Sequence, residues 1–197
     1  MTSTVTTVVI GSVVLVTVAA WVSRPLRSAL VLAPFRIRQR AEVHRLLTAG
    51  WVHADVTHLL FNMLTLWVFA DRVTTTLGMA PFIALYVSAV VVAFVPSTLL
   101  HLRDPKYSSL GASGAVSAVL FSAILLHPTI RVGIPFVPVA VSGMVYALGY
   151  LVYSAVHAYL SNDGVNHEAH FAGAVYGALF TYVLAPNHVA VALKHIL

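Results

Sequence analysis

Long apolar runs separated by short polar or charged segments make up most of this 197-residue chain. A helix that crosses the hydrocarbon core of a bilayer needs about 20 mostly apolar residues. Six of the runs approach or exceed that length and contain few Asp, Glu, Lys or Arg residues. The pattern therefore predicts six membrane-spanning helices, near residues 4–22, 55–72, 80–102, 112–127, 137–160 and 168–185.

The positions of the prolines and the composition of the first apolar run are consistent with these six helices. Most prolines fall at or near the proposed helix ends, where a missing N–H group costs nothing. Pro96 lies inside the third helix, which it is expected to kink. The first apolar run lacks the basic residues that open a signal peptide, so we expect it to remain as a helix.

The composition excludes a soluble monomer. Only 9% of the residues are charged and 59% are hydrophobic, whereas a globular protein carries about 25% charged residues. So few charges could not cover a water-facing surface, and lipid must replace water around much of the chain. The absence of cysteine excludes disulfides and cysteine-ligated metals. We expect an all-α polytopic membrane protein with a single domain over residues 1–197.

Residues 24–54 form the one long connection of this predicted bundle. They contain six arginines and one glutamate, interleaved with leucine, valine, isoleucine and aromatic residues. A basic, amphipathic segment of this kind is expected to lie in the lipid headgroup layer, although a solvated basic loop would have a similar composition. Because much of the positive excess is confined to this segment, the charge does not indicate nucleic-acid binding.

Four polar residues near helix starts are expected to lie at one depth in the membrane. His58 and Asn62 begin the second helix, Ser113 begins the fourth and His170 begins the sixth. Alternate helices of an up-and-down bundle run in the same direction, so these three starts lie on one side. Polar groups at membrane depth are costly and usually face the bundle interior, which makes this set a candidate site.

The types and spacing of these residues favour acyl-transfer chemistry. A serine hydroxyl becomes nucleophilic when a histidine takes its proton, and unpaired N–H groups at a helix start attract developing negative charge. His58 and Asn62 are four residues apart, so both side chains lie on one helix face and could donate to the same oxyanion.

Four glycines flank the candidate nucleophile and base. Gly111 permits an irregular backbone before Ser113, and Gly114 permits close approach of another helix. Gly173 and Gly177 follow His170 with the Gly-x-x-x-Gly spacing that allows membrane helices to touch. These glycines could bring the sixth helix against the fourth.

These motifs together resemble the rhomboid family of intramembrane serine proteases. The matching elements are the pattern H-x-x-x-x-H-x-x-x-N at His53, His58 and Asn62, the Gly-Ala-Ser-Gly sequence at 111–114, and the Ala-His pair at 169–170 with its two following glycines. Glu42 and Arg45 in the first loop also resemble a family feature, although His44 stands where a tryptophan is usual.

The resemblance implies a function and a role for each site residue. Ser113 would be the nucleophile and His170 the general base and acid, while His58, Asn62 and the backbone N–H of Ser113 would form the oxyanion hole. The substrates would be transmembrane proteins, cleaved in or near their membrane segments without a cofactor. The fifth helix, which is rich in glycine and proline near its start, is a candidate gate.

One departure from the family concerns the support of His170. Some relatives carry an aromatic residue four positions after the nucleophile, packed under the histidine, but this chain has Ser117 there. The imidazole must then be oriented by another group, for which the Ser117 hydroxyl and Tyr176 are the candidates.

Other functions were weighed against the protease. A metal site is disfavoured because His167 and His170 are three apart rather than four, as H-E-x-x-H zinc sites require. Paired intramembrane aspartates are absent. A haem held between His58 and His170, or a small transporter, would leave Ser113 and Asn62 without a role. An inactive relative that only binds transmembrane segments would keep the same sequence pattern.

Two arguments predict opposite orientations of the chain in the membrane. The basic first loop would face the cytoplasm under the positive-inside rule. The resemblance implies the reverse, with a cytoplasmic N-terminus and a site that opens on the non-cytoplasmic side of a bacterial-type cell membrane. We adopt the second orientation, because a segment embedded in the interface need not follow a rule derived for ordinary loops.

Overall fold

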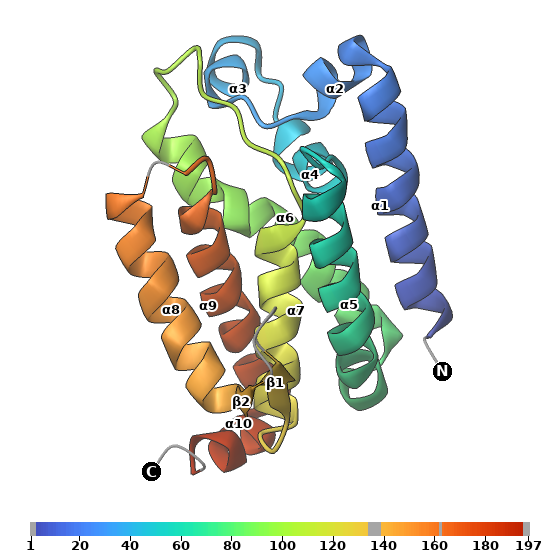
Figure 1. Ribbon diagram of the computed structural model, residues 1–197, viewed down its shortest axis with the longest axis vertical. Helices are drawn as coiled ribbons and strands as arrows, with labels where there is room; N and C mark the ends of the chain where they lie inside the picture. Colours follow the sequence, from blue (N-terminus) through green and yellow to red (C-terminus); the bar gives the residue numbers. More distant parts are fainter. Residues whose placement is uncertain (1–2, 134–138, 162, 195–197) are drawn as a thin grey trace.

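Six long helices lie side by side and form the body of the protein (Figure 1). The computed structural model describes residues 3–133, 139–161 and 163–194. The six helices start and end within a few residues of the predicted positions, except for the fifth. They are α1 (Thr4–Val22), α5 (Val56–Leu77), α6 (Met79–Leu100), α7 (Ser113–Leu126), α8 (Gly143–Leu160) and α9 (His167–Leu184).

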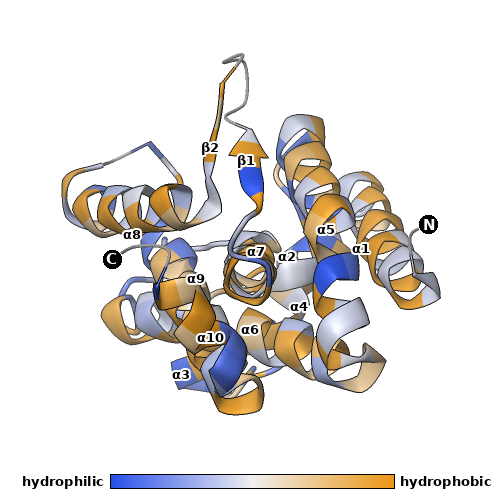
Figure 2. Cartoon of the chain, turned by 90° about the horizontal axis from the view of Figure 1, so that it is seen from below, coloured by the Kyte–Doolittle hydropathy of each residue, from blue (hydrophilic) through white to orange (hydrophobic). Residues whose placement is uncertain are grey.

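Helix α7 is the centre of the bundle. Seen along its axis, it lies near the middle of the bundle and packs against α5, α6 and α9 (Figure 2). All of its residues from Gly114 to Leu126 are buried. A helix that is apolar on every side can be buried in a protein core or span a membrane, and this short helix is buried among its neighbours.

The outward faces of the outer helices are apolar, as Figure 2 shows. By length and hydropathy, α1 and α6 are each able to cross a membrane. Helix α9 passes the same test only with α10 (Pro186–Leu193), from which it is bent by 118°. Helix α5 carries Asp71 and Arg72, and α7 has only 14 residues.

The first loop folds into short helices at the end of the bundle where α5, α7 and α9 begin (Figure 1). These are α2 (Arg24–Leu30), α3 (Pro34–Arg40), α4 (Arg45–Thr48) and the 3₁₀ turn η1 (Ala49–Trp51). Arg45 is 2% exposed. Its guanidinium pairs with Glu42 at 2.6 Å and donates to the Ser28 and Val31 carbonyls. The buried Arg45 side chain therefore links α2 and the residues that follow it to Glu42 within the first loop.

One prediction about the C-terminal half was wrong, and one helix there was not predicted. The fifth helix begins at Gly143, not at residue 137, because a hairpin of β1 (Arg131–Gly133) and antiparallel β2 (Ala140–Ser142) precedes it. The β-branched Val139 and Val141 favour extended backbone there. The prolines at 135 and 138, which were read as the helix start, lie outside the described residues. Helix α10 was not predicted.

Candidate functional site

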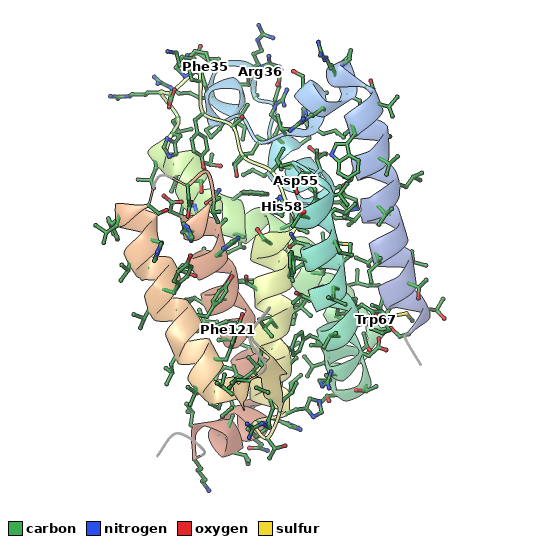
Figure 3. All side chains as sticks on the ribbon, in the orientation of Figure 1. Phe35, Arg36, Asp55, His58, Trp67 and Phe121 are labelled. Carbon is green, nitrogen blue, oxygen red and sulfur yellow. The ribbon has the colours of Figure 1, made fainter. Side chains whose placement is uncertain are left out.

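The starts of α5, α7 and α9 lie at the same end of the bundle, as the alternation of helix direction predicts. Figure 3 shows Asp55 and His58 at this end of α5. Asp55 caps the helix, because its carboxylate accepts the His58 N–H at 2.8 Å. Asn166 caps α9 in the same way, accepting the Ala169 N–H at 2.9 Å. Local capping therefore determines where the two helices begin and at what level their polar residues lie.

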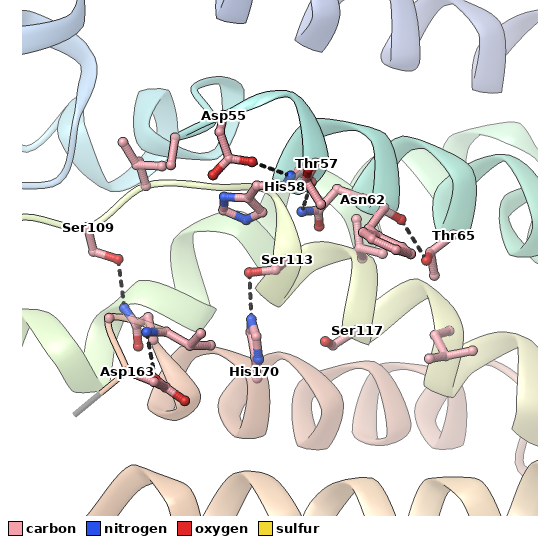
Figure 4. A pocket seen from close by; sticks show the side chains of 18 of the residues that line it. Asp55, Thr57, His58, Asn62, Thr65, Ser109, Ser113, Ser117, Asp163 and His170 are labelled. Carbon is pink, nitrogen blue, oxygen red and sulfur yellow. Dashed lines mark hydrogen bonds between the residues drawn. The ribbon is translucent and has the colours of Figure 1, made fainter. Parts of the chain in front are cut away.

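The Ser113 hydroxyl and the His170 imidazole are hydrogen-bonded. Ser113 Oγ lies 2.7 Å from His170 Nε2 (Figure 4). Ser113 is the first residue of α7, and its approach segment turns at Gly111, whose φ of +117° favours glycine. The structure thus brings together a hydroxyl on the fourth predicted helix and an imidazole on the sixth.

Glycines bring α7 and α9 into backbone contact. A Cβ added to Gly173 would overlap the carbonyl of Gly114, and one added to Gly177 would overlap the carbonyl of Ala118. A Cβ on Gly114 would overlap the Ala93 side chain. The interface therefore has no space for side chains at these positions, and it holds the backbones that carry Ser113 and His170 at a short, fixed separation.

His58 and Asn62 lie on the face of α5 that is turned toward Ser113 (Figure 4). A Cβ on Gly111 would come within 2.6 Å of His58 Cε1, so the imidazole lies directly over that glycine. Asn62 is 6% exposed, and its Nδ2 donates to the His58 carbonyl at 2.9 Å. A side-chain amide has two N–H groups, so Asn62 keeps one for a ligand.

A cavity of about 850 Å³ connects these four residues. Its walls come from α5, α7, the start of α9 and the Tyr146 and Tyr150 side chains of α8. The segment before α9 contributes Asp163, which is exposed. Hydrogen bonds from the Val165 N–H and the Ser161 hydroxyl hold the pKa of Asp163 below its ordinary value, so this carboxylate is charged at neutral pH.

Tyr150 lies beside His170, a proximity that the sequence did not indicate. Its ring is inclined by 28° to the imidazole, with 6.3 Å between centroids. Ser117 contacts this tyrosine and not the histidine, with 2.6 Å between the two hydroxyl oxygens. The Tyr176 hydroxyl instead donates to Ser88. The structure therefore places the Ser117 and Tyr176 hydroxyls against partners other than His170. The four-residue spacing of Tyr146 and Tyr150 indicated only that they share a face of α8.

His53 is a second residue whose role the sequence did not indicate. It is fully buried, and burial lowers the pKa of its imidazole to about 3. The neutral ring accepts the Ala112 N–H at Nε2, at 3.3 Å, while its Nδ1 lies 3.1 Å from the Thr17 hydroxyl. His53 thereby links α1 to the backbone immediately before Ser113.

Among the residues that the structure describes, no three His, Asp or Glu side chains lie close enough together to hold a metal ion. His167 lies beside His170, with 5.9 Å between ring centroids, and its Nε2 is 3.2 Å from Asp163. These two side chains form a local pair at the start of α9 and leave Nδ1 of His167 without a hydrogen-bond partner.

Comparison with known proteins gives consistent matches. The sequence profile of the Rhomboid domain matches residues 40–187. The presenilin-associated rhomboid-like protein, mitochondrial, of Mus musculus is 31% identical over 134 residues, which cover 67% of this chain and 36% of that protein. Rhomboid protein 1, mitochondrial, of Saccharomyces cerevisiae is 28% identical over 144 residues, covering 70% and 40%.

These relatives are longer than this chain. It spans less than half the length of the relatives named above. Both names place the relatives in mitochondria, so the expectation of a bacterial-type cell membrane is not supported by them.

Proposed function

This chain belongs to the rhomboid family, an integral membrane family, and from that premise we propose that it is an intramembrane serine endopeptidase. It would hydrolyse peptide bonds in or near the transmembrane segments of membrane-protein substrates. The observation that carries the proposal is the 2.7 Å hydrogen bond between Ser113 Oγ and His170 Nε2, at the wall of a large cavity. A serine buried only for helix packing would not need an imidazole as its partner.

The reaction would proceed through an acyl-enzyme. Ser113 Oγ attacks the scissile carbonyl while His170 Nε2 takes its proton. The negative charge that develops on the carbonyl oxygen is stabilised by the Ser113 N–H, which is free at the first position of α7, and by Asn62 and His58 across the cavity. His170 then protonates the leaving amine and activates a water that releases the acyl group.

The six long helices would all span the bilayer. Helix α7, about 21 Å long at 1.5 Å per residue, is shorter than the hydrocarbon core but surrounded by protein, so its ends need not reach lipid. In Figure 1 the N-terminus lies at the end of the bundle opposite the site. The site would open on the non-cytoplasmic side; cysteines introduced at Ser161 and Thr74 should then react with a membrane-impermeant reagent from opposite sides of the membrane.

Substrates would enter between α5 and α8. The cavity is lined on one side by Phe61 and Asn62 of α5 and on the other by Tyr146 and Tyr150 of α8. Outward movement of α8 would therefore widen the cavity toward lipid without disturbing the contact between α7 and α9. A transmembrane segment must also unwind locally, because its peptide bonds are hydrogen-bonded within the helix.

The decisive experiment combines active-site labelling with proteolysis. Purified protein in detergent is treated with a fluorophosphonate probe and, separately, with a model transmembrane substrate. We expect labelling and cleavage by the wild type, and neither by Ser113→Ala. A folded wild type that gives neither signal would contradict the protease. If it still bound the transmembrane segment, it would be an inactive member of the family.

A further inference from the structure

We propose that Asn166 is a positioning residue that fixes His170 relative to Ser113. This inference rests on the proposed function. It arises from the side-chain amide of Asn166, which makes four hydrogen bonds to three separate parts of the chain. The backbone carbonyl of Asn166 accepts the His170 N–H at 3.3 Å, but the printed partners of its side chain are other residues, so the amide would act through the backbone segments that carry Ser113 and His170.

The amide oxygen holds the start of α9. Oδ1 accepts the backbone N–H of Ala169 at 2.9 Å, which is the helix cap, and the hydroxyl of Ser97 at 2.8 Å. Ser97 is fully buried within α6. The first turn of α9, which contains His170, is thereby held against a neighbouring helix as well as capped.

The amide nitrogen holds the segment that leads to Ser113. Nδ2 donates to the Ser109 hydroxyl at 3.0 Å, drawn as the dashed line from Ser109 in Figure 4, and to the Tyr107 hydroxyl at 3.3 Å. Both partners are themselves held in place. Ser109 exchanges backbone hydrogen bonds with Leu32, and the Tyr107 ring stacks on His101 with 3.6 Å between centroids.

These four bonds use both N–H groups of the amide and both lone pairs of its oxygen. They join the two chain segments that bear the proposed nucleophile and base at a point outside the helix contact. The glycine contact between α7 and α9 fixes the distance between the helix bodies, and Asn166 adds a direct side-chain link between the segments that precede them. This link would fix the relative position of Ser113 and His170. A misplacement of about 1 Å between reacting groups costs on the order of a hundredfold in rate.

Asn166→Asp separates this role from simple helix capping. Aspartate caps a helix as well as asparagine does, and its oxygens still accept from Ala169 and Ser97. It has no N–H to donate, however, so the Ser109 and Tyr107 hydroxyls lose the bonds that they accept and regain them only if they rotate to donate. Ser109→Ala removes one of the same contacts without adding a charge. Asn187→Ala, on the exposed face of α10, is the matched control. For each variant the experiment measures the thermal unfolding midpoint in detergent, kcat and KM for a transmembrane substrate, and the rate of fluorophosphonate labelling.

We expect Asn166→Asp to keep the unfolding midpoint and KM of the wild type while kcat and the labelling rate fall about tenfold or more. Ser109→Ala should lower both rates in the same direction, and Asn187→Ala should change nothing. The inference is overturned if Asn166→Asp has wild-type rates, because Asn166 is then only a cap. It is also overturned if Ser109→Ala keeps the wild-type rates, since the aspartate charge alone would explain the loss. A wild type that neither cleaves nor labels would instead remove the proposed function and this inference together.

Discussion

The two sides of α7 are built in opposite ways. Toward α9 the contact is backbone against backbone, because Gly173 and Gly177 lie on the carbonyls of Gly114 and Ala118. Toward α5 and α8 the helix faces a cavity of about 850 Å³ lined by polar and aromatic side chains. The closed side holds together the backbones that carry Ser113 and His170, whose hydrogen-bonded side chains reach the cavity. The open side carries His58 and Asn62.

This contrast separates two requirements of the proposed reaction. The proton transfer between Ser113 and His170 needs a distance that does not vary, which close glycine packing provides. The substrate needs space and water, which only the open side offers. The first three predictions below each concern one side of α7, and the last concerns the position where the two sides meet.

The largest effect is expected from removing the base on the closed side without changing its packing. His170→Ala should lower kcat by about 10²–10⁴, because no other group accepts the Ser113 proton. The unfolding midpoint should change little, since the glycine contacts remain. Turnover of a transmembrane substrate is the measurement, and His188→Ala on the exposed face of α10 is the control. Wild-type turnover by His170→Ala would assign the base elsewhere.

On the open side, the proposed oxyanion donors should be slightly less important than the base. His58→Ala and Asn62→Ala should each reduce kcat by about 10²–10³, because each removes a donor aimed at the developing charge. Thr65 lines the same cavity but donates to the Phe61 carbonyl of its own helix. Thr65→Ala is therefore the matched control, and an equal loss in that variant would argue for a general effect on α5.

Adding a side chain to the glycine contact between α7 and α9 should destabilise the protein. Gly173→Ala places a methyl group on the Gly114 carbonyl, and overpacking of this kind typically costs about 1–3 kcal/mol. Gly149 on α8 has nothing within 4 Å of an added Cβ, so Gly149→Ala should be neutral or slightly stabilising. Thermal unfolding in detergent compares the two. Equal midpoints would mean that the α7–α9 contact adapts and does not set the distance between Ser113 and His170.

The smallest effect is expected where the two sides meet. Tyr150→Phe removes the hydroxyl that bonds Ser117 but keeps the ring against His170. The loss should be about 0.5–1.5 kcal/mol of stability, with turnover reduced only a few-fold. Tyr153→Phe, on the same helix and half exposed, is the control. A loss as large as that of His170→Ala would give the hydroxyl a direct part in the chemistry.

Much of this architecture could be predicted because its causes are local. The ends of α5 and α9 coincide with capping residues, Asp55 and Asn166, that precede apolar runs. The hairpin before α8 was missed because its short β-branched stretch continues an apolar run and looks like the beginning of a helix. Helix α10 was missed for a different reason. A proline is as common just after the end of a helix as at the start of one, and Pro186 was read only as an end.

The sequence by itself indicated which apolar runs become helices, where most of the long helices begin, and that Ser113, His170, His58 and Asn62 share one level. Those properties follow from hydropathy, capping and the parity of alternating helices. Only the tertiary structure decided that Tyr150, not Ser117 or Tyr176, lies against His170, and that Asn166 and His53 connect to the segment before Ser113. Such contacts depend on the rotation and separation of packed helices, which are set by close packing among all of them and have no periodic signal in the chain.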